Sequence, residues 1–572
     1  MTPTSDEIVI VQVGTGTSAA GLYRLGDGTV RALARVEAAW AGAGELLDLL
    51  GRAAGRELGP SVPVLTLPQE PWPVLVAGVA RGITAESVYK AVQDAGLAAS
   101  DILSVDDRRM DHEKVAAIRR APKRAAVLGG GVDAGLLEFG QGQQVTDMAG
   151  LLARGLLPGA VPVVYAGSRE ALPGVEKALE GHALILAENP RPVLEEENLE
   201  GLVKVLVNVY REAAGPAVWP WGLAFRRGLA LVQPGLGDNV LAVGLHGTSA
   251  EVASVIDGQA HRTGYQEDWP EPRRMASRTL PWDTVAQWLP WPAGDQEENV
   301  LENFRLRPAT VAMEPREMLV RHAYHRVLLG RALAEHQEMV STLRGLKKAR
   351  TIADVFADRQ TTGGTTLVDM KRIKNIIAAG PAWREYGILA LALALVDGLQ
   401  PVGLTGLLWD RDDIIVAAGV AAMEWPAQTT PSGDGLVQGL VPLGAVAAIT
   451  GRSGAGLGHV LGRVEWSTGG EHFQEPIQAG VVRRFPLPAG QWRVNIVPAR
   501  GVDAGAGPGQ PVSGMVPGGP AGLIVDGRSR PVRVHTGRDP DTWRQVARWY
   551  EGVGAMPAGI TAAVAPGKVG VK

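Results

Sequence analysis

The chain has 572 residues, a formal net charge of −4 at neutral pH and no cysteine. This length is enough for about three domains, each with its own core. The mild acidity gives no reason to expect a nucleic-acid partner, and the absence of cysteine excludes disulfides, cysteine-ligated iron–sulfur clusters and thiolate zinc sites.

The sequence contains no stretch typical of a targeting signal or of a membrane span. The N-terminal stretch MTPTSDEIVIVQV lacks the basic segment and apolar core of a signal peptide. The longest apolar helical run, Gly387 to Val396, is too short to cross a bilayer. We therefore expect a soluble, cytoplasmic protein with several domains and no membrane partner.

One stretch of the sequence occurs twice, as Ile8 to Gly28 and as Asp238 to Gly258. Each copy has an apolar run, a Val-Gly pair, a turn ending in Gly-Thr-Ser-Ala, and a second apolar run closing on Asp-Gly. Apolar runs of strand length around a glycine-bearing turn predict a β-hairpin. The repetition favours a duplicated fold with a nucleotide between the halves over two unrelated turns.

The turns of the two hairpins are candidate phosphate-binding sites. Glycines let the backbone close tightly, and successive N–H groups with Thr and Ser hydroxyls can hold a phosphate. The candidate residues are Gly14, Thr15, Gly16, Thr17 and Ser18 in the first copy and Gly247, Thr248 and Ser249 in the second.

Strand and helix patterns alternate between the two hairpins, which predicts a mostly parallel sheet covered by helices. The expected strands are Val74 to Val79, Ile102 to Val105, Ala125 to Leu128, Val161 to Ala166 and Ala183 to Leu186. The expected helices are Arg35 to Leu58, Glu86 to Ala95, Glu113 to Arg120, Val145 to Arg154, Ala171 to Leu179 and Leu199 to Ala213. A loop of tryptophan and proline around Trp219 to Trp221 follows.

Asp133 follows a predicted strand and a run of three glycines. Ligands of α/β sheets sit at such strand-end loops, which makes Asp133 a binding candidate. A turn aspartate that bonds its own backbone explains the pattern equally well.

The second half contains a tryptophan- and proline-rich region, Arg262 to Glu298, which we interpret as an ordered loop excursion and a contact surface. The other expected elements are a long helix Glu314 to Lys348, a strand Val368 to Ala379, a helix Tyr386 to Leu399, a strand Leu407 to Asp410 and a helix Asp413 to Met423. From Thr430 the chain becomes rich in Gly and Pro with short alternating segments, which predicts a separate, mainly β domain.

Together these patterns divide the chain into four parts. We expect a first half at 1–235, a second half with the long helix at 236–429, a mainly β domain at 430–540, and a terminal helix with a tail at 541–572.

The order of several short motifs resembles the glutamate mutase L family (MutL/GlmL), which is unrelated to the mismatch-repair protein of the same abbreviation. The motifs are the two hairpins, Leu128-Gly-Gly-Gly-Val-Asp-Ala-Gly135, Val163-Val-Tyr-Ala-Gly-Ser168, Ala187-Glu-Asn-Pro-Arg-Pro192, Arg307-Pro-Ala-Thr-Val-Ala-Met-Glu-Pro-Arg316, Val396-Asp-Gly-Leu-Gln-Pro401, Gly501-Val-Asp-Ala-Gly-Ala-Gly-Pro-Gly509 and Gly522-Leu-Ile-Val-Asp-Gly-Arg528. No single motif is specific, but their order spans nearly the whole chain.

The resemblance implies a fold of the actin, sugar-kinase and heat-shock-chaperone ATPase superfamily. The fold class would be α/β, with two duplicated actin-like (ribonuclease H-like) halves around a cleft and a C-terminal mainly β domain. Family members are encoded beside adenosylcobalamin-dependent mutases, so a cobalamin-dependent mutase or another protein subunit is the implied partner. ATP or ADP, with Mg²⁺, is the implied cofactor.

The sequence departs from the superfamily where phosphoryl transfer needs carboxylates. Each hairpin of the superfamily supplies an aspartate at the end of its first strand, to position Mg²⁺ or the attacking water. Aligned on Val-Gly, this chain has Gln12 in the first hairpin, and Ala242 in the second, with Leu245 replacing a glycine. Glu251 lies near a later acidic position, and Gly380 is the one glycine left of the adenosine-contacting loop.

We therefore expect no efficient ATP hydrolysis, and no catalytic or metal-ligating residue is assigned. Nucleotide binding without turnover and an empty pseudo-ATPase cleft both remain open. The expected function is a chaperone-like accessory protein that reactivates or assembles an adenosylcobalamin-dependent mutase. The alternative is a scaffolding pseudo-ATPase that binds a partner protein without nucleotide turnover; a small-molecule kinase is opposed by the missing aspartates.

Other chemical patterns have simpler explanations. Helix-surface histidines are usually solvated, so His322, His325 and His336 are not expected to bind a metal. The aspartates of Asp410 to Asp413 suit the first turn of a helix. The glycine-rich loop Gly501 to Gly509 lacks the Lys-Ser/Thr ending of a phosphate loop, which favours a turn of the β domain.

Overall fold

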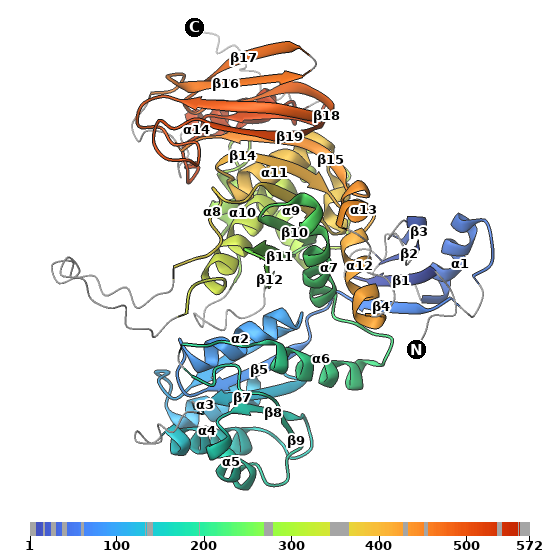
Figure 1. Ribbon diagram of the computed structural model, residues 1–572, viewed down its shortest axis with the longest axis vertical. Helices are drawn as coiled ribbons and strands as arrows, with labels where there is room; N and C mark the ends of the chain where they lie inside the picture. Colours follow the sequence, from blue (N-terminus) through green and yellow to red (C-terminus); the bar gives the residue numbers. More distant parts are fainter. Residues whose placement is uncertain are drawn as a thin grey trace, which may run out of the picture.

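The computed structural model describes residues 7–14, 18–24, 30–36, 43–58, 62–131, 133, 141–193, 195–267, 278–343, 365–426, 433–450, 456–468, 470–534, 540–558 and 560. These residues form three sheets with helices around them (Figure 1). The strands are β1(Glu7–Val13), β2(Ser18–Arg24), β3(Val30–Val36), β4(Val64–Pro68), β5(Pro73–Gly78), β6(Ala98–Ser104), β7(Ala125–Gly130), β8(Val163–Gly167), β9(Leu184–Leu186), β10(Val240–His246), β11(Ser249–Ile256), β12(Gln259–Gln266), β13(Asn375–Ala379), β14(Gly403–Trp409), β15(Val441–Ala448), β16(Val460–Thr468), β17(Glu471–Gln478), β18(Val482–Pro498) and β19(Val512–Asp526).

The helices pack against these sheets or between them. They are α1(Ala43–Ala54), α2(Thr84–Asp94), α3(Asp111–Arg120), α4(Gln141–Gly155), α5(Leu172–Ala178), α6(Glu200–Ala214), α7(Trp221–Leu236), α8(Trp282–Ala286), α9(Asp295–Leu306), α10(Pro315–Met339), α11(Ile388–Leu399), α12(Ile414–Glu424), α13(Gly433–Gln438) and α14(Pro540–Val553). No helix in these described ranges is long and apolar enough to cross a membrane.

Both halves of the chain begin with the same sheet topology, as the repeated sequence predicts. In the first half the strand order is β3-β2-β1-β4, and in the second it is β12-β11-β10-β13-β14. In each, a three-stranded antiparallel meander is joined by a strand parallel to its first strand. The first half also has a reduced fifth strand, because Val218 forms a parallel bridge with Thr66 of β4. The expected fold, α/β with two duplicated actin-like halves, is confirmed.

The parallel strands between the hairpins form a sheet of their own, which the sequence did not distinguish from the first half. Its order is β6-β5-β7-β8-β9, with all pairs parallel. This is the doubly wound order of flavodoxin-like sheets. The second strand, β6, is added on one side of β5, and the later strands β7, β8 and β9 are added on the other side. This sheet lies at the bottom of Figure 1, away from the four-stranded sheet, and we call it the inserted body.

The C-terminal strands continue the sheet of the second half without interruption. The ten-stranded sheet runs β12-β11-β10-β13-β14-β15-β19-β18-β16-β17, so β15 pairs with β14 across residue 430. A separate core of this region contains Trp466, Trp492 and Ile496 among other apolar side chains. The C-terminal part is mainly β, and its division from the second half at residue 430 remains a proposal.

Helices α7 and α12 cross each other between the two duplicated sheets (Figure 1). Each helix has a glycine at the crossing, Gly228 in α7 and Gly419 in α12. A Cβ atom at Gly228 would lie 1.8 Å from the carbonyl oxygen of Ile415, and one at Gly419 would lie 1.9 Å from that of Ala224. The close crossing therefore depends on two glycines, each of which lies against the backbone of the other helix.

Several expected elements differ from the observed ones. The stretch from Arg35, expected to be helical, begins with the end of β3. Helix α7 begins at Trp221, in the stretch expected to be a loop, and its remaining residues were given no expected element, because its three glycines and Pro234 weaken the helical pattern. The expected loop excursion from Arg262 to Glu298 contains the end of β12, α8 and the start of α9. Residues 268–277 of that region, and the basic run 344–350, lie outside the described residues.

Candidate functional site

The two hairpins close with loops of different length. In the first, the last pair is Val13 with Ser18, which leaves a loop of four residues. Gly14 and Ser18 are buried, whereas the candidates Thr15, Gly16 and Thr17 lie outside the described residues. In the second, the last pair is His246 with Ser249, so the loop is Gly247-Thr248 alone. The shared Gly-Thr-Ser-Ala sequence therefore does not produce two identical turns.

The turn of the second hairpin is held by other parts of the chain. Gly247 has a φ of +61°, the left-handed region that suits the first central residue of a two-residue hairpin loop. Its carbonyl oxygen accepts a hydrogen bond from Nε2 of His325 at 2.8 Å, and the Thr248 carbonyl accepts one from the Glu267 N–H at 3.1 Å. Both carbonyls of the turn are thus used within the protein.

A tryptophan connects the ends of the two first strands. The indole Nε1 of Trp221, the first residue of α7, donates a hydrogen bond to Oε1 of Gln12 at 3.0 Å. The same indole lies edge-on to the His246 ring, with centroids 4.4 Å apart. A Cβ at Gly244 would lie 2.6 Å from the indole. Trp221 therefore lies between the two hairpins, in contact with Gln12 of the first and His246 of the second.

The imidazole of His246 is buried between charged and aromatic neighbours. Its side chain is almost completely buried, and neither ring nitrogen has a partner among the described residues. Burial, together with the nearby positive charges of Arg262 and Arg384, lowers the pKa of the His246 imidazole to about 3. The first hairpin closes with the pair Val13–Ser18 and the second with His246–Ser249. Gln12, one residue before its closing pair, therefore corresponds to Leu245 and not to Ala242. The residue of the second hairpin that contacts Trp221 is His246.

Glu251 is fully engaged in an ion pair with Arg262. Nε and Nη2 of the buried guanidinium bind both carboxylate oxygens. Its Nη1 donates to the carbonyls of Gln93, at 3.0 Å, and Leu97, at 3.2 Å. Arg262 therefore joins β12 to α2 of the inserted body, and Glu251 is the counterion of this link rather than a free acid.

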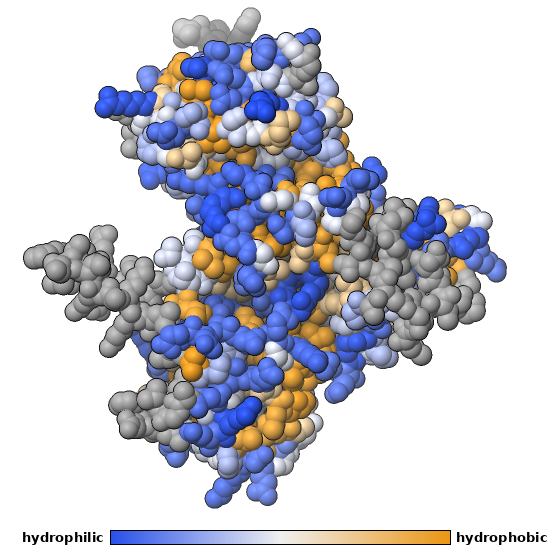
Figure 2. Space-filling view, viewed as in Figure 1, coloured by the Kyte–Doolittle hydropathy of each residue, from blue (hydrophilic) through white to orange (hydrophobic). Residues whose placement is uncertain are grey.

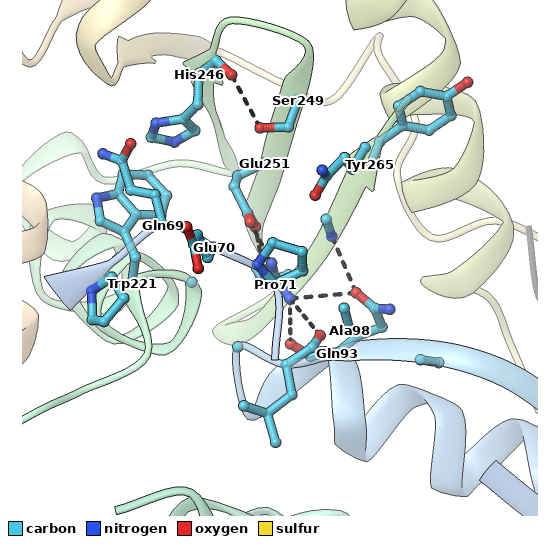
Figure 3. A pocket seen from close by; sticks show the side chains of 18 of the residues that line it. Gln69, Glu70, Pro71, Gln93, Ala98, Trp221, His246, Ser249, Glu251 and Tyr265 are labelled. Atoms are coloured by element: carbon cyan, nitrogen blue, oxygen red, sulfur yellow. Dashed lines mark hydrogen bonds and ion pairs between the residues drawn. The ribbon is translucent and has the colours of Figure 1, made fainter. Parts of the chain in front are cut away.

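A pocket lies at the junction of the inserted body and the second half. It has about 610 Å³ of empty space, counting space open to solvent. Figure 3 shows Ser249 and Glu251 from β11 at one side, Trp221 at another, and Gln93 and Ala98 of the inserted body below. Its two arginines, Arg262 and Arg278, are paired with Glu251 and Glu335. With its cations paired in this way, the pocket has no guanidinium available for a phosphate.

The remaining candidates lie in two places. Gly380, at the end of β13, has a φ of +91°, and a Cβ there would lie 2.8 Å from the backbone of Leu245, so it adjoins the second hairpin. Asp133 lies in the inserted body, after β7. Its carboxylate accepts a hydrogen bond from the Arg169 N–H at 3.2 Å and from Asn189 at 3.4 Å, which ties the loops after β7, β8 and β9 together. The structure brings Gly247, Thr248, Ser249, Glu251 and Gly380 together and leaves Asp133 apart.

The histidines of α10 are buried, so the expectation of solvated side chains was wrong. His322 accepts from the Tyr550 hydroxyl and donates to the Ala390 carbonyl. His336 lies between the hydroxyls of Ser254 and Thr263. No three histidine or acidic side chains in the described ranges are placed to hold a metal ion. The three histidines join α10 to neighbouring elements instead.

We expect acid to destabilise the protein through these histidines. Burial lowers the pKa of His325 to about 4 and of His336 to about 3, and the pKa of His322 also lies well below its usual value. Because the unfolded chain takes up protons near pH 6.5 and the folded chain does not, stability is present above that pH and is lost as the pH falls towards 4. Each buried histidine, His246 included, contributes up to about 1.4 kcal/mol per pH unit.

Asp410 opposes this trend, since burial and the neighbouring charge of Asp413 raise its pKa to about 7. Because four histidines lower the free energy of unfolding on acidification and one carboxylate raises it, the net effect of acid is to destabilise the protein. The urea midpoint should therefore change little between pH 7.5 and pH 6.5 and fall from pH 6.5 to pH 5. An unchanged midpoint below pH 6.5 would show that the histidines are not buried as described.

The acidic and glycine-rich motifs have structural roles. Oδ1 and Oδ2 of Asp410 accept hydrogen bonds from the N–H groups of Ile414, at 2.7 Å, and Ile415, at 3.0 Å, at the start of α12. In the loop 501–509, Asp503 accepts from the N–H groups of Gly505, at 2.6 Å, and Gly507, at 2.9 Å. The loop therefore folds around its own carboxylate, as the interpretation as a β-domain turn requires.

Sequence reasoning missed the residues that shape the site most. The sequence placed Trp221 in a loop and Arg262 at the start of a loop excursion. His246 lies at the end of strand β10. A buried tryptophan with its N–H bonded is not distinguishable in sequence from a loop anchor. The one available signal was the polar Gln12 in an otherwise apolar strand.

Comparison with known proteins gives a family. A family model described as MutL protein matches residues 73–430, more than half of the chain. No curated protein matches the chain. The match begins at β5 and ends before α13, so it contains the inserted body and the second half.

Solved structures resemble the chain only distantly. A nucleotide-free acetone carboxylase is 10% identical, with 82% of this chain and 81% of that one covered and a TM-score of 0.29. The xylulose kinase from Bifidobacterium adolescentis is 14% identical, with 76% and 93% covered and a TM-score of 0.26. The ROK hexokinase from Thermus thermophilus is 13% identical, with 74% and 100% covered and a TM-score of 0.21. Likenesses at this level carry no argument about activity.

Proposed function

Because the chain belongs to the MutL family, we propose that it is a chaperone-like accessory protein of an adenosylcobalamin-dependent mutase, built on an ATPase fold that no longer turns over nucleotide. The observation that carries the proposal is the contact of Trp221 with Gln12 and His246. An indole and an amide carry no charge with which to neutralise a metal-bound triphosphate, and an imidazole whose pKa is lowered to about 3 is a weak base for activating water.

The described side chains around the hairpins, which exclude residues 15–17, do not fit Mg²⁺. This ion prefers carboxylate and water oxygens in octahedral geometry. Oε1 of Gln12 already accepts the Trp221 N–H, and both oxygens of Glu251 are bound by Arg262. ADP or ATP without a metal remains the cofactor to test.

We expect the protein to release no phosphate from ATP above background, with or without Mg²⁺. Calorimetric titration with ADP and ATP should give no heat of binding to the unaltered chain, because the indole fills the space between the hairpins. Trp221→Ala should then gain measurable ADP binding, since it removes that obstruction. Magnesium-dependent turnover by the unaltered protein would contradict the proposal.

Trp219→Ala is the matched control for this test. Trp219 is also buried and donates its indole N–H to Glu424 at 3.0 Å, but it lies under the guanidinium of Arg211 and away from the hairpins. It should lose stability without gaining ADP binding. If both variants bound ADP, general loosening would explain the effect and not the removal of an obstruction.

The effect of nucleotide on binding of the mutase distinguishes the two candidate roles of this protein. An accessory protein that cycles would release or bind the purified mutase differently with ADP and ATP. A scaffolding pseudo-ATPase would form the same complex under all conditions. The filled space between the hairpins favours a complex that is independent of nucleotide. If the mutase does not bind at all in gel filtration or calorimetry, the accessory role fails.

A further inference from the structure

The pocket at the junction of the inserted body and the second half contains a buried histidine without a partner. His246 lines the pocket and is only 7% exposed. Neither nitrogen of its ring forms a hydrogen bond with any residue that the structure describes. A buried polar group without a hydrogen bond lowers the stability of a fold, so a native one needs an explanation. Figure 3 shows the ring at one side of the pocket, together with Gln69 and Trp221.

The other buried histidines of the described ranges differ from His246 in this respect. His322, His325 and His336 each use both ring nitrogens in hydrogen bonds. The fold therefore satisfies a buried imidazole where the ring joins two elements. His246 instead lines a pocket, where a bound molecule can complete its hydrogen bonds.

The register of the sheet places further polar groups beside His246. Across the strands β10, β11 and β12, His246 lies opposite Ser249, and Ser249 lies opposite Gln266. Residues directly opposite each other point to the same face of a sheet, so these three side chains form one row. All three line the pocket, as does Gln69 in the segment between β4 and β5. The side-chain amides of Gln69 and Gln266 have no hydrogen bond to a described residue.

These groups can both donate and accept hydrogen bonds. A neutral imidazole has one donor and one acceptor nitrogen, and a glutamine amide has a donor NH₂ group and an acceptor oxygen. Oγ of Ser249 donates to the His246 carbonyl at 3.2 Å, which leaves its lone pairs as acceptors. Hydroxyl and carboxamide groups match such a lining, because they also donate and accept. A carboxylate only accepts, and an ammonium group only donates.

The charged groups of the pocket are already paired or solvated. Arg262 and Arg278 are paired with Glu251 and Glu335. The other carboxylate of the lining, Glu70, is exposed to solvent. An anion would find no available guanidinium, and a cation would find only a solvated carboxylate, so neither would regain the hydration that it loses on burial. These pairings favour an uncharged ligand.

The size and the walls of the pocket suit a small molecule. Its space of about 610 Å³, counting space open to solvent, lies within the range of about 300–1000 Å³ usual for small ligands. Apolar surface comes from Pro68, Pro71, Leu97, Trp221 and Tyr265. Figure 2 shows hydrophilic and hydrophobic residues interspersed on the visible surface where the inserted body meets the rest of the molecule. A ligand with an apolar frame and a few polar groups fits this lining.

We propose that this pocket is a binding site for a small uncharged molecule, whose hydroxyl or carboxamide groups exchange hydrogen bonds with His246, Gln69 and Gln266. The site draws on three parts of the chain: Gln69 follows the first sheet, Gln93 belongs to the inserted body, and His246 belongs to the second half. A ligand there contacts all three parts and stabilises their arrangement. The proposal is independent of the accessory role, because the pocket can be filled whether or not a mutase binds.

Three probes of the same shape test the charge preference of the pocket. Benzamide is neutral, benzoate is its anionic counterpart and benzamidine its cationic one, while myo-inositol is a neutral probe with hydroxyl groups only. In calorimetric titrations at millimolar concentration, at least one neutral probe should bind about tenfold more tightly than benzoate and benzamidine. Tighter binding of benzamide would identify a carboxamide ligand, and tighter binding of myo-inositol a hydroxylated one. If neither neutral probe binds, or a charged probe binds as tightly, the proposal is wrong.

His246→Leu should weaken binding of the neutral probe by about tenfold or more, because leucine has no hydrogen-bonding group. The free variant should be at least as stable as the unaltered chain, since the ring gives up no hydrogen bond to a described residue. His336→Leu is the matched control, because the His336 ring is also buried but bonds to Ser254 and Thr263. It should lose stability and bind the probe within twofold of the unaltered chain. Equal losses of stability in both variants would show that His246 has a structural role and would overturn the proposal.

A second pair of variants does not alter a buried residue. Gln266→Ala removes a half-buried amide without a partner among the described residues, so this variant should fold normally and weaken binding of the probe about threefold or more. Gln259 lies exposed at the other end of β12, outside the pocket, so Gln259→Ala should bind the probe as the unaltered chain does. Equal affinities in His246→Leu, Gln266→Ala and Gln259→Ala would mean that the probe binds elsewhere, which would refute the assignment of this pocket.

Discussion

Replacing Asp397 with alanine is expected to destabilise the second half by about 3–5 kcal/mol, because it leaves the buried Arg326 without its carboxylate partner and removes one of the two carboxylates that pair with Arg528. Oδ2 of Asp397 pairs with Nε of Arg326 at 3.0 Å, and Oδ1 pairs with Nη2 of Arg528 at 2.6 Å. The side chains of all three residues are at most 2% exposed. Arg528 and Arg530 also pair with Asp526.

This ionic cluster joins four elements of the chain. Arg326 lies on α10, Asp397 on α11 and Asp526 at the end of β19, while Tyr550 of α14 lies under the Arg326 guanidinium at 4.4 Å. The cluster therefore fixes the C-terminal strands and the last helix to the second half. Partial unfolding should separate these parts first in the variant.

Asp257→Ala is the control for Asp397→Ala. Asp257 also pairs with an arginine, Arg372, but the two side chains are 63% and 50% exposed. Exposed pairs contribute about 0–1 kcal/mol. Urea unfolding followed by circular dichroism should separate the two variants clearly. Equal midpoints would mean that the buried cluster is not needed for stability.

Gly228→Ala is expected to cost at least about 3 kcal/mol, although alanine is the better helix former. The new Cβ would lie 1.8 Å from the carbonyl oxygen of Ile415, and a backbone atom cannot move aside as a side chain can. Helices α7 and α12 would have to separate, and with them the two duplicated sheets. The thermal midpoint should fall strongly, or the soluble yield should be lost.

Gly150→Ala is the matched control, since Gly150 also lies inside a helix, α4, and a Cβ there would meet nothing within 4 Å. It should be neutral or stabilise by up to about 1 kcal/mol, the difference in helix propensity. A Gly228→Ala protein as stable as Gly150→Ala would refute the close crossing of α7 and α12.

The family motifs found in the sequence acquire physical meaning in the structure. The motif around Val396 to Pro401 supplies Asp397, and the one around Gly522 to Arg528 supplies Asp526 and Arg528, so the two motifs meet in one ionic cluster. Sequence order identified both but not their contact. A contact between α11 and the end of β19 depends on how the sheet places them.

The sequence by itself determined the duplicated hairpins and the presence of a neutral Gln12 near the end of the first strand. Both follow from local patterns: the period of apolar residues, the turn glycines, and the identity of Gln12. The boundaries of most strands and helices between the hairpins also followed from such patterns.

Only the tertiary structure decided that the parallel strands form a separate inserted body, that the C-terminal strands extend the second sheet, and that Trp221 fills the space between the hairpins. Strand pairing, helix crossing and burial arise between residues far apart in the chain. A local pattern predicts that a strand exists but contains no information on which edge it joins.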